Sequence, residues 1–187
     1  MTHNTSSYTG VTTPSPFVLT LLTAPGSAAR RIENRELPPT IQVDQTEHRE
    51  VVRRFAAGVH VYDCNSDAGT FTLREPQADL YDLKTFAQQG IHFVGPEPRT
   101  GQWSDADGSR VVARVIAAVD APAPADPTKD AQWLKVEAFQ NFGAGVFSDV
   151  TFVQRVLTYG GQAPPSCKNN TTVIVPYTTL YIFWARQ

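Results

Sequence analysis

Short apolar runs with a period of two, separated by glycine and proline turns, are the feature that most constrains how this chain can fold. In a strand, successive side chains alternate between two faces, whereas an amphipathic helix repeats every three to four residues. We expect strands at residues 59–62, 71–73, 111–119, 133–142, 150–158 and 173–184, with turns at 65–69, 107–108, 121–127, 143–145 and 160–165. Helical runs of ten to fifteen residues are not interleaved with these strands, which disfavours a doubly wound α/β sheet. The pattern therefore predicts an all-β fold, an antiparallel β-sandwich or β-barrel.

The domain organisation follows from the length of 187 residues, which suits one well-buried core. Residues 1–16 are rich in Thr and Ser and are expected to form a flexible leader. We interpret residues 17–40 as an N-terminal arm that packs on the domain, with at most one or two short helices before a double proline. A degenerate secretory signal at 17–24 is the alternative, although no Lys or Arg precedes it. Residues 41–187 then form a single β domain.

The charge balance limits the kinds of partner that the protein is expected to bind. Sixteen Lys and Arg residues against eighteen Asp and Glu residues give a formal net charge of -2. No segment gathers the basic residues into a stripe that could neutralise a row of phosphates, so no nucleic-acid partner is expected. No apolar run is long enough to span a bilayer, so no membrane span is expected. A small-molecule ligand or substrate is the expected partner; the oligomeric state stays open, and a homodimer is compatible with the sequence.

Common catalytic motifs and metal-binding spacings are missing from the sequence. It contains no Gly-x-Ser-x-Gly elbow, no Gly-x-x-x-x-Gly-Lys phosphate loop and no Gly-x-Gly-x-x-Gly turn, so nucleotide-dependent enzymes are disfavoured and no cofactor is expected. The histidines are not paired at ligand spacing and neither cysteine has a second ligand nearby, so no metal site is expected. His60 and His92 lie in expected strands, where structural histidines are commoner than catalytic ones. His92 is kept as a catalytic candidate.

The two cysteines, Cys64 and Cys167, lie at the end of an expected strand and just after the last Gly-Pro turn. In an oxidising compartment they could pair and close a loop of about 100 residues, which stabilises by roughly 4 to 5 kcal/mol in the chain-entropy model. The alternative is a pair of reduced, buried thiols in a cytosolic protein. The disulfide is the favoured expectation of the two.

Charged residues inside an otherwise apolar strand are the least usual feature of the sequence. Alternation puts Lys135 and Glu137 on one face with the aromatic Phe139. If that face lines a cavity, Lys135 and Glu137 form an acid-base or binding pair and Phe139 contacts the substrate. The alternative is a solvent-facing pair on the outside of an antiparallel sheet. Arg155 on the following strand is a further catalytic candidate, with Glu137 as its expected carboxylate partner.

Aromatic side chains suggest a pocket. Tyr177 and Tyr181 alternate along the last expected strand, both faces of which are substantially apolar. Their hydroxyls are either satisfied within the core or serve as the polar groups of an aromatic binding pocket. We take Tyr177, Tyr181, Trp103 and Tyr62 as substrate-binding candidates.

A series of motifs runs in order along most of the chain. They are Gly58-Val59-His60-Val61-Tyr62 with Cys64, Pro76-x-Ala78-x-Leu80-Tyr81-Asp82, Gly90-Ile91-His92-Phe93-x-Gly95-Pro96, Trp103 with Asp107-Gly108-Ser109, Trp133-Leu134, and Gln154-Arg155-x-x-Thr158-x-Gly160-Gly161-x-x-Pro164 with Cys167. From about residue 41 to 184 the chain resembles the family known as domain of unknown function 3455. The resemblance implies a small secreted or periplasmic protein, which favours pairing of the cysteines. Some fungal relatives are labelled malate dehydrogenase, but an NAD-dependent dehydrogenase needs a dinucleotide-binding βαβ unit, which is missing here.

The chain departs from the family pattern in ways that suggest a repurposed member. Its leader lacks a convincing signal, residues 95–103 are lengthened, and Lys135 and Glu137 interrupt an otherwise apolar strand. The expected function is binding of a small, largely apolar, natural-product-like molecule, with cofactor-independent cyclisation or isomerisation as the reaction. The alternative is a non-catalytic secreted or periplasmic binding or structural protein stabilised by the disulfide. The compartment stays open: the missing signal flank favours the cytoplasm, and the resemblance favours export.

Overall fold

The computed structural model of the chain describes residues 31–97 and 100–187. Its strands are β1 (His48–Asn65), β2 (Thr70–Asp82), β3 (Gln88–Val94), β4 (Thr100–Asp105), β5 (Arg110–Val119), β6 (Trp133–Phe142), β7 (Val150–Gly160) and β8 (Thr172–Arg186). The expected leader and the greater part of the expected arm lie outside the described residues. A compact unit begins at Asn34 and runs to the end of the chain.

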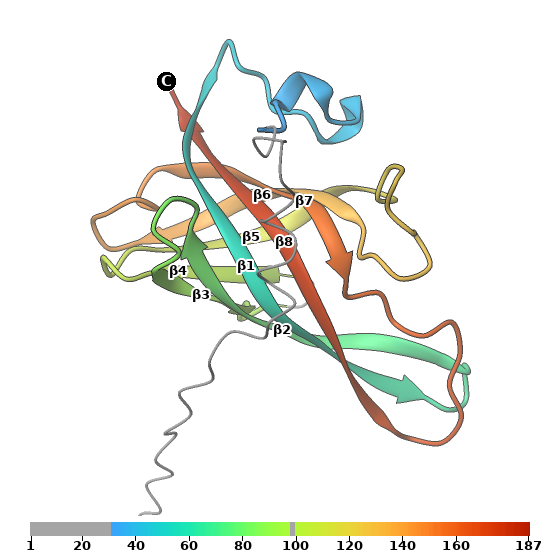
Figure 1. Cartoon of the computed structure of the whole chain (residues 1–187). Helices are drawn as coiled ribbons and strands as arrows, with labels where there is room; N and C mark the ends of the chain where they lie inside the picture. The colour runs from blue at the N-terminus through green and yellow to red at the C-terminus, as the bar shows by residue number, and fades with distance from the viewer. Residues whose placement is uncertain (1–30, 98–99) are drawn as a thin grey trace, which may run out of the picture. The chain divides into compact units, whose positions relative to one another are not determined.

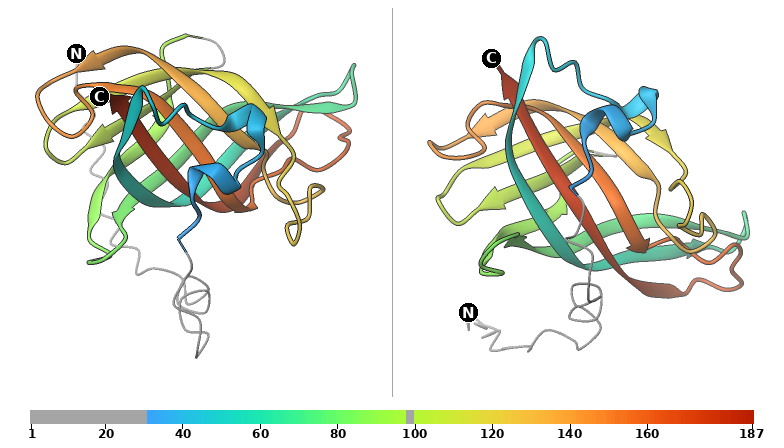
Figure 2. Two further views of the ribbon diagram at one scale, coloured as in Figure 1. Left: turned by 90° about the horizontal axis from the view of Figure 1, so that it is seen from above. Right: turned by 45° about the horizontal axis from the view of Figure 1, so that its top comes forward.

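The eight strands form one closed antiparallel barrel (Figure 1). Each strand pairs with its successor, and β1 also pairs with β8 along nearly its whole length, which closes the sheet on itself. Figure 2 shows the same barrel from two further directions. Closure removes the free sheet edges within the barrel itself. The all-β prediction is confirmed, and of its two alternatives the structure is the barrel.

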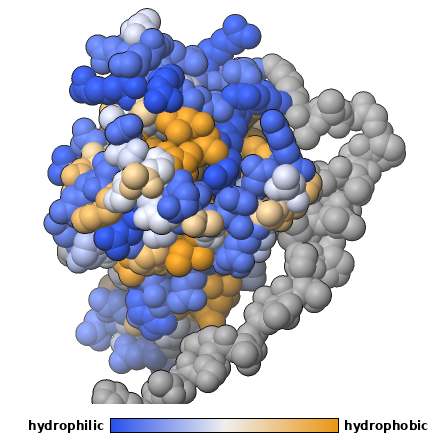
Figure 3. Space-filling view, turned by 90° about the vertical axis from the view of Figure 1, so that its left-hand side faces the viewer, coloured by the Kyte–Doolittle hydropathy of each residue, from blue (hydrophilic) through white to orange (hydrophobic). Residues whose placement is uncertain are grey.

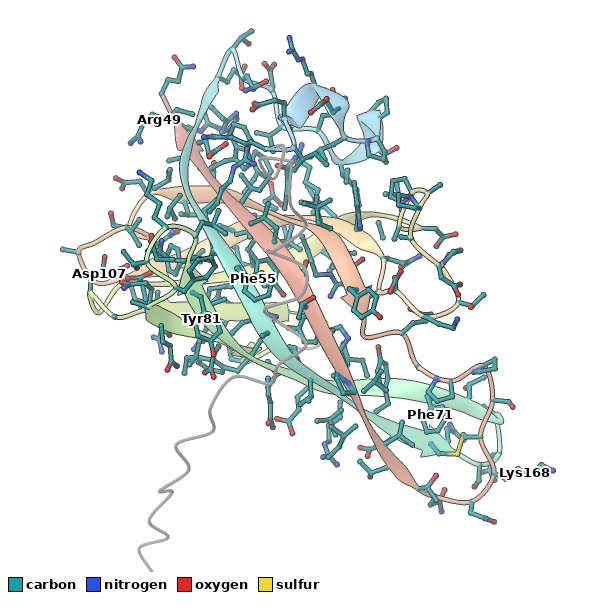
Figure 4. All side chains as sticks on the ribbon, viewed as in Figure 1. Arg49, Phe55, Phe71, Tyr81, Asp107 and Lys168 are labelled. Carbon is teal, nitrogen blue, oxygen red and sulfur yellow. A yellow bond between two sulfur atoms is a disulfide. The ribbon has the colours of Figure 1, made fainter. Side chains whose placement is uncertain are left out.

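Strands β1, β2 and β8 are longer than the rest and continue past the barrel as a three-stranded extension (Figure 1). A disulfide between Cys64 and Cys167 joins the end of β1 to the loop before β8, with Cα atoms 5.9 Å apart. It is drawn as a yellow bond near Phe71 and Lys168 in Figure 4. Backbone hydrogen bonds from both cysteine amides hold the same loop, with Thr171 as one of the acceptors. The expected cross-link is therefore confirmed, and the cysteines are not reduced thiols.

A glycine in β1 allows β1 and β2 to approach closely. A Cβ atom at Gly58 would lie 2.0 Å from the carbonyl oxygen of Gln77 and 2.5 Å from the Cα of Ala78. Both clashing atoms belong to backbone, which cannot move aside as a flexible side chain can. Only glycine fits this pairing without shifting the two strands apart.

Two short 3-10 helices, η1 (Asn34–Glu36) and η2 (Pro39–Ile41), cover part of the outer barrel wall. A buried polar network holds them there. The Gln154 side-chain amide donates to Asn34 Oδ1 at 2.9 Å and to the Ile41 carbonyl at 2.7 Å, and its oxygen accepts from Trp184 Nε1 at 2.8 Å. The side-chain nitrogen of Gln154 thus attaches this segment, which corresponds to the C-terminal part of the expected arm, and the side-chain oxygen is held by Trp184 of β8.

One end of the barrel is filled by side chains from a neighbouring loop. Phe147 is fully buried and stacks on Phe183 with ring centroids 4.4 Å apart. Asn141 donates hydrogen bonds to the carbonyls of Phe147 and Val150, which holds the loop across this end. Asp107, labelled in Figure 4, lies on the side of the barrel away from the disulfide and accepts from the Val146 amide. This end of the barrel is closed.

The surface seen in Figure 3 carries apolar side chains in separate groups among hydrophilic ones. Among large apolar residues of the described chain, Tyr159 and Ile174 are the most exposed, at 68% and 64%. Singly exposed apolar side chains are normal on protein surfaces. In the described part of the chain, no helix is long and apolar enough to cross a membrane.

Candidate functional site

The barrel interior is lined by layers of aromatic rings. Next to Phe183 at the closed end, Trp103 stacks on His92 at 4.4 Å, and both rings meet Tyr181 edge to face. Toward the other end, His60 stacks on Tyr177 with ring centroids 4.1 Å apart. These residues come from β1, β3, β4 and β8, whose alternation directs every second side chain inward.

A cavity of about 270 Å³ opens at the end of the barrel opposite Phe147. Strands β1, β2, β5, β6 and β7 and the segments before β6 and after β7 contribute its wall. The lining residues are His60, Tyr62, Leu73, Val115, Ala118, Ala131, Gln132, Leu134, Arg155 and Gln162. Half of them are polar and half apolar. The lining is more polar than that of most small-molecule sites, in which a few polar groups lie among predominantly apolar side chains.

His60 is a buried, neutral imidazole in the wall of this cavity. Its Nδ1 lies 2.8 Å from the carbonyl oxygen of Gly161, and Tyr62 Oη donates to the same oxygen at 2.6 Å. Because a carbonyl oxygen only accepts, Nδ1 carries the proton and Nε2 is an unprotonated acceptor. Nε2 is buried and has no hydrogen-bond partner among the described residues. Burial, assisted by the positive charge of Arg155, lowers the His60 pKa to about 4, so the ring is neutral at physiological pH.

Arg155 brings a positive charge into the cavity wall. Its Nε and Nη2 donate to the Gln132 carbonyl at 3.1 and 2.8 Å, which fixes the guanidinium beside the opening. None of the cavity-lining residues is acidic, and no carboxylate of the described residues forms an ion pair with Arg155. The expected partner, Glu137, instead pairs with Arg114 at 3.1 Å. The guanidinium has further N–H groups beyond the two that hold Gln132.

Two tyrosines and a tryptophan leave polar atoms unpaired just below the cavity. Tyr177 Oη, Tyr181 Oη and Trp103 Nε1 are buried and make no hydrogen bond of acceptable geometry with the described residues. Burial raises the pKa of both tyrosines; for Tyr181 the nearby Arg155 opposes that rise. Both hydroxyls are therefore neutral donors at physiological pH. Buried polar groups in native proteins normally have a partner, so unpaired ones beside a cavity mark a place for water or ligand.

His92 lies deeper in the barrel than the cavity and does not line it. Its Nδ1 is 2.9 Å from the Gln102 carbonyl, and burial lowers its pKa to about 3. Its ring is held between Trp103 and Tyr181. This placement supports a packing role for His92 within the aromatic layer.

Lys135, Glu137 and Phe139 share a face of β6, as alternation predicts, but that face is the outer wall of the barrel. The opposite residues of β6, including Val136, belong to the core. Lys135 Nζ donates to the Gln42 carbonyl at 2.8 Å and lies over the Phe152 ring, beneath the segment that covers the wall. Phe139 is the extra residue at a bulge opposite β5 and does not line the cavity. The expected acid-base pair inside a pocket is therefore not formed, because the polar face of β6 points outward.

The structure adds cavity residues that the sequence-based candidates omitted. Of those candidates, Tyr62 and Arg155 line the cavity, and Tyr177 and Tyr181 lie below it. His60 is the main addition, and its spacing of two from Tyr62 on β1 was the available signal. Gln132 and Gln162 lie in turns, where no periodicity indicates which side chains face a cavity. Their contribution depends on how the barrel closes.

Metal ions and known relatives complete the description of the site. In the described ranges, no group of three or more His, Cys, Asp or Glu residues is arranged to hold a metal ion. A family model described as a protein of unknown function (DUF3455) matches residues 45–185, a span that reaches from just before β1 to nearly the end of β8. No curated protein and no solved structure matches the chain. The matched span contains every residue that lines the cavity.

Proposed function

The chain belongs to the DUF3455 family of proteins of unknown function, and we propose that its barrel binds a small, largely apolar molecule in the open-end cavity and cyclises or isomerises it without a cofactor. The observation that carries the proposal is the set of unpaired polar groups at and below the cavity. His60 Nε2 is buried without a hydrogen-bond partner among the described residues, and the buried hydroxyls of Tyr177 and Tyr181 form no well-aligned hydrogen bond, although Tyr181 interacts with Tyr177 and Arg155. Such groups are costly to a fold unless something else satisfies them.

The chemistry of these groups suits reactions in which negative charge develops on a substrate oxygen. The Arg155 guanidinium can donate to that oxygen, and a neutral His60 imidazole can accept a proton or hydrogen bond from the same molecule. Neutral tyrosine hydroxyls add donors near the inner end of the cavity. The reaction proposed is one of positioning and charge stabilisation, which requires no metal or redox group.

A second candidate, non-catalytic binding outside the cytoplasm, is favoured by one observation. The Cys64–Cys167 disulfide is a cross-link that persists in oxidising compartments and is rare in the cytosol. Binding without turnover uses the same cavity and the same polar groups. The two candidates differ in whether a bound molecule leaves unchanged, which NMR of the recovered ligand detects even when its mass is conserved.

Ligand-observed NMR with a panel of neutral aromatic and aliphatic fragments tests the binding proposal. Ala118 is exposed and lines the cavity, so Ala118→Trp fills the opening with little strain on the core. We expect fragments to bind the wild-type protein and to lose at least tenfold in affinity in this variant. Ile116→Trp is the matched control, since Ile116 is exposed on the same strand and does not line the cavity. Binding that is equal in Ala118→Trp and wild type would contradict the proposal.

A further inference from the structure

We infer that the ligand of this cavity is an anionic amphiphile: a carboxylate or similar oxyanion directed at Arg155, joined to an apolar body that leaves the barrel across Leu73 and Val115. This inference rests on the proposed function and names the class of molecule that the cavity takes. It is carried by the charge balance inside the barrel and by the distribution of apolar residues at the opening.

Among the described residues, Arg54 and Arg155 both point into the barrel, and only Arg54 forms an ion pair with a carboxylate. Arg54, near the closed end, pairs with Asp105 at 3.0 Å and lies 3.8 Å from Asp82. Arg155, at the open end, has no carboxylate partner among the described residues; it donates to the neutral Gln132 carbonyl and interacts with the neutral Tyr181 hydroxyl. A partly buried guanidinium without a counter-charge has a strong preference for an anion. The contrast with Arg54 indicates that the partner of Arg155 comes from outside the chain.

Acidic residues near this opening are already engaged elsewhere. Asp120 accepts from the Gln132 side-chain amide at 3.0 Å. Asp130 accepts from the backbone amides of Gly160 at 2.6 Å and Asp126 at 2.8 Å. These carboxylates hold the segments around the cavity in place. Neither of them forms an ion pair with Arg155.

Two apolar residues of the cavity, Leu73 and Val115, lie at its outer side, together with the exposed Gln132 and Gln162. Leu73 on β2 and Val115 on β5 are 44% and 39% exposed, whereas His60 is 1% exposed. A polar group thus lies at the inner wall and exposed apolar side chains lie at the opening. This order fits a molecule that enters with its polar end first and leaves its apolar end on the rim.

The size of the cavity supports the same orientation. Sites that enclose a whole drug-sized ligand are about 300 to 1,000 Å³. The cavity here is about 270 Å³ and open on one side, so it holds a head group and a short part of the attached body. The remaining apolar surface of a larger ligand would lie against the rim, where its burial adds affinity.

Calorimetric titration with three eight-carbon probes on the wild-type protein tests the charge of the head group. The probes are octanoate, octanamide and octylamine, all below the concentrations at which they form micelles. Octanoate and octanamide have nearly the same shape and differ in charge. We expect octanoate to bind about tenfold more tightly than octanamide, and octylamine to show no binding. Equal affinity for octanoate and octanamide would overturn the anionic head group while leaving small-molecule binding intact.

Variants of Arg155 test whether that residue is the source of the preference. We expect Arg155→Gln to reduce the octanoate-to-octanamide affinity ratio to about one, and Arg155→Lys, which keeps the charge, to retain part of it. Arg114→Gln is the control, because Arg114 is an exposed arginine on the outer wall. If Arg155→Gln unfolds, the Arg155→Lys result and the wild-type probe series still decide the question. An unchanged ratio in folded Arg155→Gln would assign the anion to another site.

The position of the apolar body is tested by chain length. We expect affinity to rise about two- to fourfold per methylene from butanoate to octanoate, as partial to full burial of each group requires. Leu73→Ser should flatten this rise, and Ile174→Ser, which changes an exposed residue of the same extension outside the cavity, should not. Failure of all carboxylates to bind would overturn the inference. The neutral fragment panel with Ala118→Trp would then decide separately whether the cavity binds any small molecule.

Discussion

At the scale of single residues, the proposed site depends chiefly on His60 and Arg155. They occupy the same cavity wall and have complementary hydrogen-bonding capacities, one an acceptor and the other a donor. Arg155 also contributes to keeping His60 neutral, after burial itself. A neutral imidazole beside a cation avoids like-charge repulsion inside the barrel, so the pair is stable only while His60 remains unprotonated.

The buried histidines make stability depend on pH. His60 and His92 have folded-state pKa values of about 4 and about 3, lowered chiefly by burial from 6.5 in the unfolded chain. The unfolded state therefore binds more protons below pH 6.5, and stability falls as pH decreases from there toward the folded-state values. Between pH 7.5 and pH 5 we expect each histidine to lower the free energy of unfolding by about 2 kcal/mol, as measured by urea titration.

His60→Gln and His92→Gln each remove one of these groups, so each variant should lose part of the pH dependence. If one of them fails to fold, the other still provides the comparison. A wild-type unfolding free energy that is constant from pH 7.5 to pH 5 would contradict burial of the two neutral rings.

At the scale of elements, the segment from Asn34 to Ile41 is hydrogen-bonded to the barrel through the Gln154 side chain. Gln154→Leu keeps roughly the same volume but removes partners from Asn34, the Ile41 carbonyl and Trp184 Nε1, all of them buried. We expect a loss of about 3 kcal/mol in the free energy of unfolding, because buried polar groups left unpaired cost about 1 to 3 kcal/mol each. Chemical denaturation followed by tryptophan fluorescence measures it.

Gln140→Leu is the matched control for this prediction. Gln140 is an exposed residue of β6, and changes at such positions usually alter stability by less than about 0.5 kcal/mol. A Gln154→Leu variant as stable as Gln140→Leu would show that the buried network does not hold the segment on the barrel wall.

At the scale of the whole molecule, local alternation and turn chemistry were sufficient to predict an all-β fold. The turns at 65–69 and 107–108 occur where Gly and Asp residues indicated them. Barrel closure could not be predicted in this way, because β1 and β8 pair across more than 100 residues of sequence. The short β4 strand, rich in polar residues and glycine, also lacked a clear alternation.

The same limit explains which site residues were predicted. Alternation states which side chains share a face, and it grouped Lys135 with Glu137 correctly. It does not state which face of a strand is inside a closed barrel. The candidates Arg155 and Tyr62 lie on inward-facing positions and line the cavity. The charged face of β6, with Lys135 and Glu137, lies on the outside of the barrel. For His60 the sequence favours a structural role, because structural histidines in strands are commoner than catalytic ones; its contact with Gly161, about 100 residues away, has no local signal.

We propose that the open end of the barrel is a small-molecule site with Arg155 at its polar end. A crystal structure of the protein grown with saturating octanoate is the decisive experiment. We expect ligand density in the cavity, with a carboxylate oxygen within hydrogen-bonding distance of the Arg155 guanidinium and the alkyl chain passing Leu73 and Val115. A cavity without ligand density, or octanoate bound only elsewhere on the surface, would contradict it.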